Sequence, residues 1–233
     1  MFDNLFDFSN LNTLMMDAVY RIIPALICIT FHELAHGYVA YRLGDRTAKD
    51  MGRLTLNPIK HIDPLGLIMM MLVRFGWAKP VPVNMNNFKH PKWYMAVTAI
   101  AGPLSNLILA TIVFILFGFS IPLLGGAYAN GTVYYTDGVG SAVLQMIHNT
   151  AYISVALAVF NLMPIPPLDG SKVLFSLLPK GVYYKLMKYE RYGFILLILI
   201  INTQFFRGTI GYLMNVVYDS LFPAVEAAYR LVT

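Results

Sequence analysis

The stretch DAVYRIIPALICITFHELAHGYVAYRL, residues 17–43, is long and apolar enough to cross a membrane as a helix, yet it carries ionisable side chains at its centre. About 20 apolar residues are needed to cross the hydrocarbon core. Within this stretch lie Arg21, His32, Glu33 and His36. Ionisable groups at membrane depth are costly and mark functional sites by default. The stretch therefore predicts a membrane helix that carries a functional site.

The composition of the whole chain is that of a polytopic membrane protein. Of its 233 residues, 58% are hydrophobic and 12% are charged, whereas soluble domains carry about 25% charged residues. The mean hydropathy is +0.61. The single cysteine, Cys28, excludes an internal disulfide framework and a thiolate zinc cluster. The net charge of +5 falls in blocks between apolar stretches, so we expect no nucleic-acid partner.

Long uncharged windows predict further spans. No Asp, Glu, Lys or Arg occurs between Trp93 and Thr136 or between Gly138 and Leu168. Each window can hold one span, at about Tyr94–Phe119 and at about Ser141–Met163. A third, less regular span is expected at Tyr192–Tyr218, where the apolar run continues past Arg207. The segment 120–140 between the first two is rich in Gly, Asn and Tyr and is expected to be a short exposed loop.

The distribution of Lys and Arg predicts the topology. Nine of the seventeen lie in 42–93 and five in 172–191, whereas none lies in 119–140. Because cytoplasmic loops collect Lys and Arg, the first two segments are expected inside and the third outside. Four crossings satisfy this with the N-terminus outside, provided that Leu65–Trp77 does not cross. This stretch has only 13 residues and is interrupted by an arginine. The predicted fold is all-α, with about four transmembrane helices plus a re-entrant/β-hairpin segment.

The central motif is His32-Glu33-Leu34-Ala35-His36. Residues i and i+4 share a helix face one turn apart, so both histidines can ligate one Zn²⁺. Glu33 beside them can take a proton from a metal-bound water. With 5 His and 12 acidic residues in the chain, chance gives roughly 0.005 such matches. The motif predicts a zinc site within the membrane.

Catalytic zinc takes three protein ligands, so one ligand is still required. Candidates are the other histidines and acids near membrane depth. Asp169 stands out because it follows a 31-residue uncharged window and three prolines in Asn161–Gly170. Those prolines interrupt the helix, and broken backbone at membrane depth is tolerated only inside protein or along a cavity. The alternative is a helix stop with a surface Asp-Gly turn.

These two segments together resemble the site-2 protease family of intramembrane zinc metalloproteases, which has HExxH in one membrane helix and an NxxPxPxLDG-like motif in a later one. The resemblance implies that His32, His36 and Asp169 are zinc ligands and that Glu33 is the general base and acid. It also implies that Asn161 is a polar group near the metal that donates to the tetrahedral oxyanion. Further similar segments are Gly52–Pro58 with His61–Pro64, Gly76–Asn84 and Ala101–Asn106.

The likeness covers about residues 22–180 and is to the compact bacterial branch, without a PDZ insertion or a CBS-domain tail. We expect a single membrane-embedded metalloprotease domain over 1–233. Its catalytic core is about 17–180, and the C-terminal span and interfacial tail are 192–233. The expected location is the bacterial inner membrane, with the active site open toward the cytoplasm.

The resemblance implies hydrolysis of peptide bonds within or next to transmembrane segments of membrane proteins, with one Zn²⁺ per chain. The expected partners are transmembrane protein substrates and the lipid bilayer. One alternative is a non-proteolytic membrane protein that keeps zinc for transport or stability. A structural zinc would need a fourth ligand, and a transporter would show paired half-helices or repeats, which are not visible. The nearer alternative is a membrane peptidase for soluble substrates.

Three further groups of residues are secondary candidates. Pro80, Val81 and Val83 lie in an extended, proline-rich segment that could pair with an unwound substrate by β-addition; an ordinary interfacial loop is the alternative. His61 could approach the metal or gate access to it, although a structural role is favoured. Asn106 is expected to hydrogen-bond across helices and to support the site.

Overall fold

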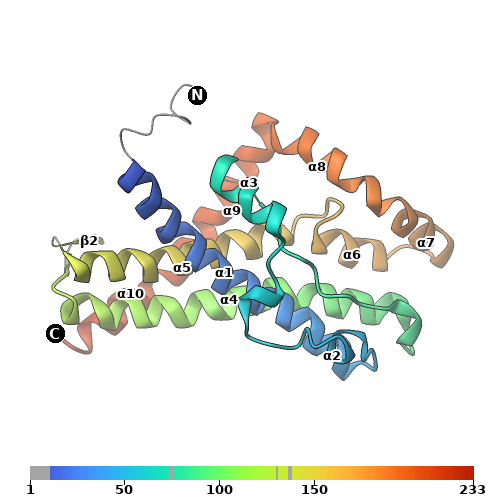
Figure 1. The fold of residues 1–233 in the computed structure, drawn as a ribbon, viewed down its shortest axis with the longest axis horizontal. Helices are drawn as coiled ribbons and strands as arrows, with labels where there is room; N and C mark the ends of the chain where they lie inside the picture. The colour runs from blue at the N-terminus through green and yellow to red at the C-terminus, as the bar shows by residue number, and fades with distance from the viewer. Residues whose placement is uncertain (1–10, 74–75, 130, 136–137) are drawn as a thin grey trace.

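The computed structural model describes residues 11–73, 76–129, 131–135 and 138–233. Helices dominate it, and a bundle of long helices runs along its longest axis (Figure 1). The long helices are α1 (Leu11–Arg42), α4 (Pro91–Leu123), α5 (Val139–Asn161) and α9 (Gln204–Leu221). The shorter helices are α2 (Thr47–Asp50), η2 (Pro58–Lys60), α3 (Pro64–Val73), η3 (Met85–Asn87), α6 (Asp169–Ser176), α7 (Lys180–Tyr189), η4 (Glu190–Tyr192), α8 (Gly193–Ile201) and α10 (Pro223–Arg230).

The predicted spans correspond to observed helices. Among the described residues, three helical stretches are long and apolar enough to cross a membrane, namely Val19–Arg42, Pro91–Leu123 and Val139–Asn161. The fourth expected span is a bent unit, in which α8 and the helical stretch 204–230 meet at 85°. The break has a local cause, because the Thr203 side chain accepts a hydrogen bond from the amide of Phe206 and starts a new helix. The expected all-α membrane fold is confirmed.

The segment predicted to be re-entrant contains α3, whose ten residues span only about 15 Å. Helix α3 is therefore too short to cross. The interrupting arginine, Arg74, lies outside the described residues. The flanks of this segment meet at an isolated antiparallel bridge between Ile62 and Ala78.

The only β-ladder in the described parts of the chain lies elsewhere. Strands β1 (Ala127–Ala129) and β2 (Thr132–Tyr134) form an antiparallel hairpin with Tyr128 opposite Val133, inside the segment that the sequence indicated as a loop.

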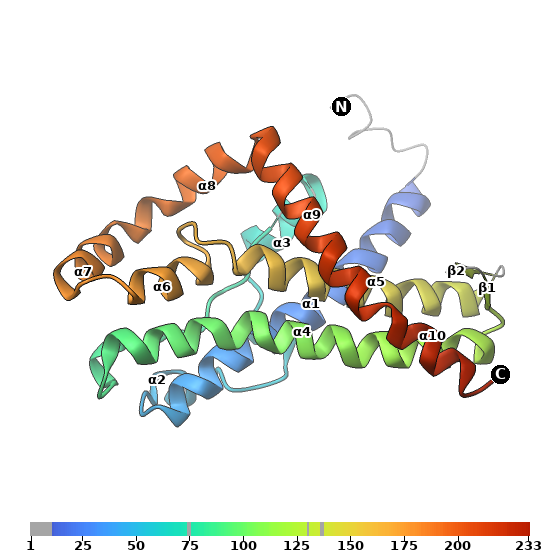
Figure 2. The ribbon, with the colours of Figure 1, turned by 180° about the vertical axis from the view of Figure 1, so that it is seen from behind.

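Helix α4 is the central element, since it packs against α1, α5, α6 and α10. Near its C-terminal end, buried Phe114, Phe117 and Ile121 pack with Leu144 and Val155 of α5. Helix α10 closes this core, and seen from behind it crosses α4 (Figure 2). The hairpin and the C-terminus lie at this end of the bundle, whereas α2 and α7 lie at the other. We call these the hairpin end and the α7 end.

Candidate metal centre

Helix α1 carries both histidines on the face that meets α4. His32 and His36 are buried, with 6% and 9% of their surfaces exposed. Their rings pack edge to face, with centroids 4.6 Å apart. Opposite them on α4 is Gly102. A Cβ atom at Gly102 would overlap the imidazole of His36 and lie 2.7 Å from Cε1 of His32. The histidines therefore fit between the two helices only because position 102 has no side chain.

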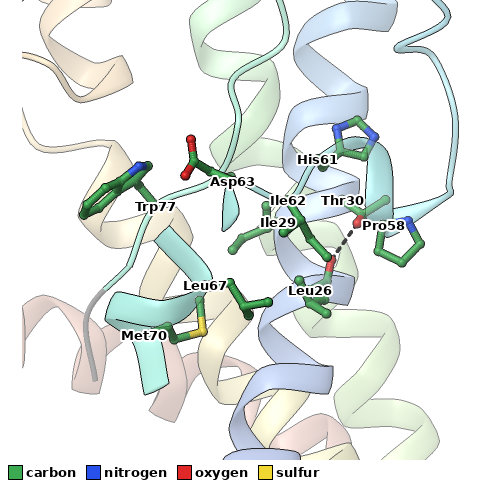
Figure 3. A pocket seen from close by; sticks show the side chains of 11 residues that line it. Leu26, Ile29, Thr30, Pro58, His61, Ile62, Asp63, Leu67, Met70 and Trp77 are labelled. Atoms are coloured by element: carbon green, nitrogen blue, oxygen red, sulfur yellow. Dashed lines mark hydrogen bonds between the residues drawn. The ribbon is translucent and has the colours of Figure 1, made fainter. Parts of the chain in front are cut away.

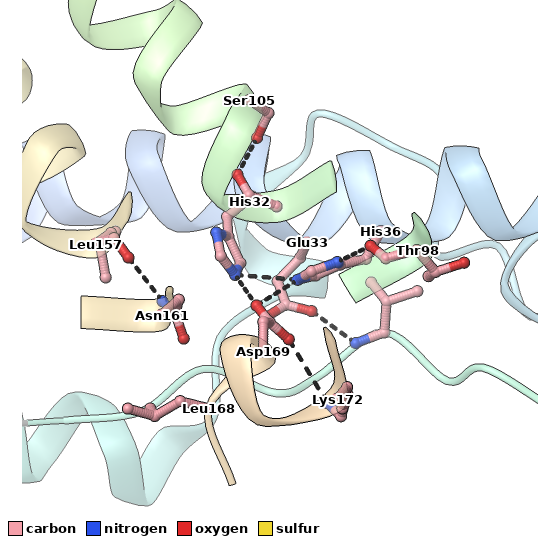
Figure 4. Close-up of polar contacts among 12 residues, drawn as sticks. His32, Glu33, His36, Thr98, Ser105, Leu157, Asn161, Leu168, Asp169 and Lys172 are labelled. Carbon is pink, nitrogen blue, oxygen red and sulfur yellow. Dashed lines mark hydrogen bonds and ion pairs between the residues drawn. The ribbon is translucent and has the colours of Figure 1, made fainter. Parts of the chain in front are cut away.

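Asp169 joins this pair from the first turn of α6, after the proline-rich loop that ends α5 (Figure 4). Its Oδ2 lies 3.1 Å from Nε2 of His32 and 3.0 Å from Nε2 of His36. The two Nε2 atoms are themselves 3.0 Å apart. Three potential ligand atoms from segments more than 130 residues apart thus form a buried triangle.

The hydrogen bonding of His36 indicates which atom it offers to the centre of this triangle. Its Nδ1 donates to the backbone carbonyl of Thr98 over 2.7 Å. A neutral imidazole carries one N–H, so Nε2 of His36 presents a lone pair to the other two atoms. Such a lone pair beside a second nitrogen and a carboxylate oxygen is stable when a cation lies among them. Two imidazoles and one carboxylate match a catalytic zinc donor set.

The second oxygen of Asp169 faces Lys172, one turn along α6. Nζ of Lys172 lies 3.5 Å from Oδ1 of Asp169 and 3.5 Å from Oε1 of Glu190. Burial opposes ionisation of Asp169, but its contacts with His32 and His36 and the charge of Lys172 hold its pKa below the usual range. Burial likewise opposes the charge of Lys172, but the two carboxylates raise its pKa. Asp169 is therefore ionised, as a metal ligand must be.

Glu33 lies beside the triangle and is held by the backbone of the proline-rich segment. Its Oε2 accepts a hydrogen bond of 2.8 Å from the amide of Val81. Pro80 and Pro82 have no N–H, so Val81 supplies the one backbone donor of this tripeptide. The segment packs closely on α1 at Gly37, where a Cβ atom would lie 2.9 Å from Cγ1 of Val81. Oε2 of Glu33 is thus fixed, whereas Oε1 makes no hydrogen bond to another described residue.

The remaining predicted residues lie around this centre. Asn161 ends α5 beside the site, and its Nδ2 donates to the carbonyl of Leu157, one turn back in the same helix (Figure 4). Asn106 is buried, and the cross-helix hydrogen bond there uses its backbone carbonyl, which accepts from Ser154. Within the described chain, the side-chain amide of Asn106 has no hydrogen-bond partner.

His61 does not belong to the ligand triangle. Its Nε2 lies 2.9 Å from the carbonyl of Thr55, and the ring lines a pocket between α1 and the α3 segment (Figure 3). Ile29, in the same pocket, lies one turn before Glu33 on α1. The pocket therefore extends along the Glu33 face of α1.

Four contributors to this centre were not predicted from the sequence, namely Lys172, Glu190, the amide of Val81 and the carbonyl of Thr98. Lys172 was counted only among the basic residues of an inside segment, and a Lys–Glu pair 18 residues apart has no recognisable spacing. The carbonyl of Thr98 is a backbone group and leaves no trace in the sequence. The histidine pair does indicate that an acceptor must lie nearby, because a metal-bound histidine donates its second ring N–H to a carboxylate, a carbonyl or water. It does not indicate which residue supplies that acceptor.

Comparison with known proteins places this geometry in a family. Residues 20–201 match the model of peptidase family M50. "Putative zinc metalloprotease YwhC" of Bacillus subtilis is 40% identical over 211 residues, which cover 91% of this chain and 93% of that protein. "Putative zinc metalloprotease Rip2" of Mycolicibacterium smegmatis is 29% identical over 185 residues, covering 76% of this chain and 64% of that one. No solved structure matches.

The family match includes α1 with both histidines and the loop and helix that bring Asp169 to them. Together with a relative 40% identical along nearly all of both chains, it shows that the protein belongs to peptidase family M50, the site-2 protease family, and is a zinc metalloprotease.

Proposed function

We propose that this protease hydrolyses peptide bonds within or next to transmembrane segments of other membrane proteins, the reaction of regulated intramembrane proteolysis. His32, His36 and Asp169 hold one zinc ion per chain, and Glu33 is the general base. The observation that carries the proposal is the buried triangle of ligand atoms, two of which belong to a helix long enough to span a membrane. A polar centre in such a place serves substrates that lie in the membrane themselves.

The chain's own groups have distinct roles in this reaction. Zinc, when bound, polarises the scissile carbonyl and lowers the pKa of water toward about 7. Glu33 takes the proton of the attacking water and returns it to the leaving nitrogen. The amide of Val81 keeps the Glu33 carboxylate in place. Asn161 uses one N–H within its helix and has a second to donate to the developing oxyanion.

We further propose that the substrate pairs with the segment around Pro80, Val81 and Val83. Because the Val81 amide is engaged by Glu33, pairing uses the backbone of Val83, whose amide has no hydrogen bond within the described chain. The resulting contact is short, as expected where prolines remove donors. It would bring an unwound substrate strand directly beside Glu33.

The domain and the orientation are also part of the proposal. The C-terminal residues 192–233 form one domain with the core 17–180, which is supported by the packing of α10 on α4. The α7 end faces the cytoplasm of a bacterial inner membrane, because the segments 42–93 and 172–191 carry most of the basic residues. Water and substrate then meet at the inner half of the bundle.

The deciding experiment uses purified protein in detergent with zinc and a single-span substrate. Mass spectrometry of the products should place the cut within or beside the apolar segment. The Glu33→Gln variant is the matched control and should give no products. Cleavage confined to soluble peptides would instead indicate a membrane peptidase for soluble substrates. Zinc binding without any cleavage would favour a non-proteolytic role.

A further inference from the structure

The carboxylate of Asp169 is held from both sides by different partners. Oδ2 faces the two histidines, whereas Oδ1 faces Nζ of Lys172 at 3.5 Å. Lys172 is three residues after Asp169, so both lie on one face of α6. A carboxylate that offers one oxygen to a metal can rotate about its side-chain bonds. The contact with Lys172 opposes such rotation.

Lys172 itself is held by a second carboxylate. Its Nζ lies 3.5 Å from Oε1 of Glu190, and the side chains of Lys172, Asp169 and Glu190 are 19%, 11% and 21% exposed. Exposed ion pairs contribute little because water screens them, but these three groups are largely removed from water. The cation between two anions is therefore restricted to one position. We call this set the Glu190–Lys172–Asp169 chain.

The backbone that follows Glu190 is closely packed. Glu190 begins η4, and Gly193 directly after η4 presses on the proline-rich loop that precedes Asp169. A Cβ atom at Gly193 would lie 2.6 Å from Cβ of Pro166. The chain on either side of η4 thus contacts the elements that carry Asp169 at two points, through the ion pair of Glu190 with Lys172 and through the close approach of Gly193 to Pro166.

We propose that Lys172 and Glu190 are positioning residues that hold the Asp169 carboxylate in its metal-facing orientation, so that zinc affinity depends on the α7–η4 segment. The inference rests on the proposed zinc site. It gives Lys172 and Glu190, which lie in a segment that the sequence indicated as an inside loop, a role at the metal centre. Groups that orient metal ligands typically change metal affinity by about 10–100-fold when they are removed.

Orientation must be separated from simple charge effects. Lys172→Met removes a cation near the metal and Glu190→Gln removes an anion, so through charge alone the two changes act in opposite directions. The double variant Lys172→Met/Glu190→Gln leaves the net charge unchanged. It therefore reports orientation. Lys172→Arg keeps the cation, and Lys185→Met on exposed α7 is the matched surface control.

The measurement is the zinc dissociation constant of the full chain in detergent, by competition with a chelator, with Glu33→Gln present throughout. The double variant should raise this constant by about 10–100-fold, while Lys172→Arg should recover most of the affinity and Lys185→Met should not change it. Glu190→Asp, which keeps the charge but shortens the reach, should weaken zinc binding by about tenfold and serves if the double variant does not fold.

A double variant with the affinity of the parent, with the two single variants shifted in opposite directions, would mean that only charge matters and would overturn the inference. Unchanged affinity in Glu190→Asp would do the same. A parent protein that binds no zinc at all would instead refute the proposed function, so the two failures are distinguishable.

Discussion

Helix α4 has one closely packed glycine toward each end, and the two glycines face different kinds of neighbour. At the α7 end, Gly102 allows the imidazoles of α1 to approach, and the space is filled by polar ligand atoms. At the hairpin end, Gly118 allows α10 to approach so closely that a Cβ atom would lie 2.7 Å from Cβ of Ala228. That space is filled by apolar packing around Phe114 and Phe117. A close contact between helices therefore does not by itself indicate a functional site. The side chains opposite the glycine determine whether the contact holds ligand atoms or apolar packing.

The largest expected difference between substitutions at the two ends is in kcat. Glu33→Gln should lower kcat by about 10²–10⁴-fold, because the proton acceptor is lost, while zinc content stays that of the parent. Glu226→Gln is the matched change at the hairpin end, where Glu226 contacts Tyr128. It should leave kcat unchanged. Full turnover in Glu33→Gln would refute the role of this residue as the base.

The next largest expected effect is on zinc binding, which should change with a substitution at the metal centre and not with one far from it. Asp169→Ala should raise the zinc dissociation constant by about 100-fold or more, because losing a ligand exceeds the effect of losing an orienting group. Asp50→Ala, an exposed carboxylate on α2, is the control and should retain zinc. A fully loaded Asp169→Ala protein would place the third ligand elsewhere, and His61 would be the next candidate.

The two glycines can be tested against each other directly. Gly102→Ala should reduce zinc affinity by about tenfold or more, because the new methyl group overlaps the His36 ring. Gly118→Ala should instead cost about 1–3 kcal/mol of stability through overpacking and leave zinc affinity unchanged. Chelator competition and thermal unfolding measure the two effects. If both variants lost zinc equally, the separation between the ends would be wrong.

The hydrogen bond from Val81 to Glu33 can be removed without changing charge. Val81→Pro deletes the donor, and the following proline already favours the extended backbone that proline needs. We expect kcat to fall by about 10–100-fold with KM little changed, from the loss of a hydrogen bond to a charged group of about 1.5–3 kcal/mol. Val81→Ala keeps the amide and should retain most of kcat. Equal loss in both variants would assign the effect to side-chain packing.

The smallest effect concerns Asp45, which links the end of α1 to the segment before α4. It accepts hydrogen bonds from the backbone of Asn84 and the side chain of Asn87. Burial opposes its ionisation, but these bonds and those from Thr47 hold its pKa below the ordinary value of an aspartate. Its contribution to stability is therefore complete above the unfolded-state pKa of about 3.9, and it is lost as the pH falls through the lower folded-state pKa.

Thermal unfolding measured at several pH values checks this prediction. Asp45→Asn should flatten the acid limb of the stability curve and leave zinc affinity at neutral pH unchanged. An identical acid limb in parent and variant would exclude Asp45 as the titrating group.

The sequence was most informative where chemistry and hydropathy conflict. Ionisable residues inside an apolar run identified α1, and the prolines before Asp169 identified the loop that returns to it. Two features of the site were not predictable. Val81 and Thr98 contribute backbone atoms, which every residue has, and Lys172 resembles the other lysines of a basic loop. The break at Thr203 was missed because the cap of α9 is a local hydrogen bond within an otherwise apolar run.

His36 donates to a main-chain carbonyl, that of Thr98, so saturation mutagenesis at position 98 would not report on this hydrogen bond. No replacement at position 98 can delete that oxygen, so tolerated changes there would be mistaken for evidence of a site remote from catalysis. The hydroxyl of Thr98 is buried and unpartnered within the described chain, and Val would fill the same volume. Fitness scores at this position should follow side-chain size, whereas sensitivity to the hydrogen bond would emerge only from changes that displace the α4 backbone.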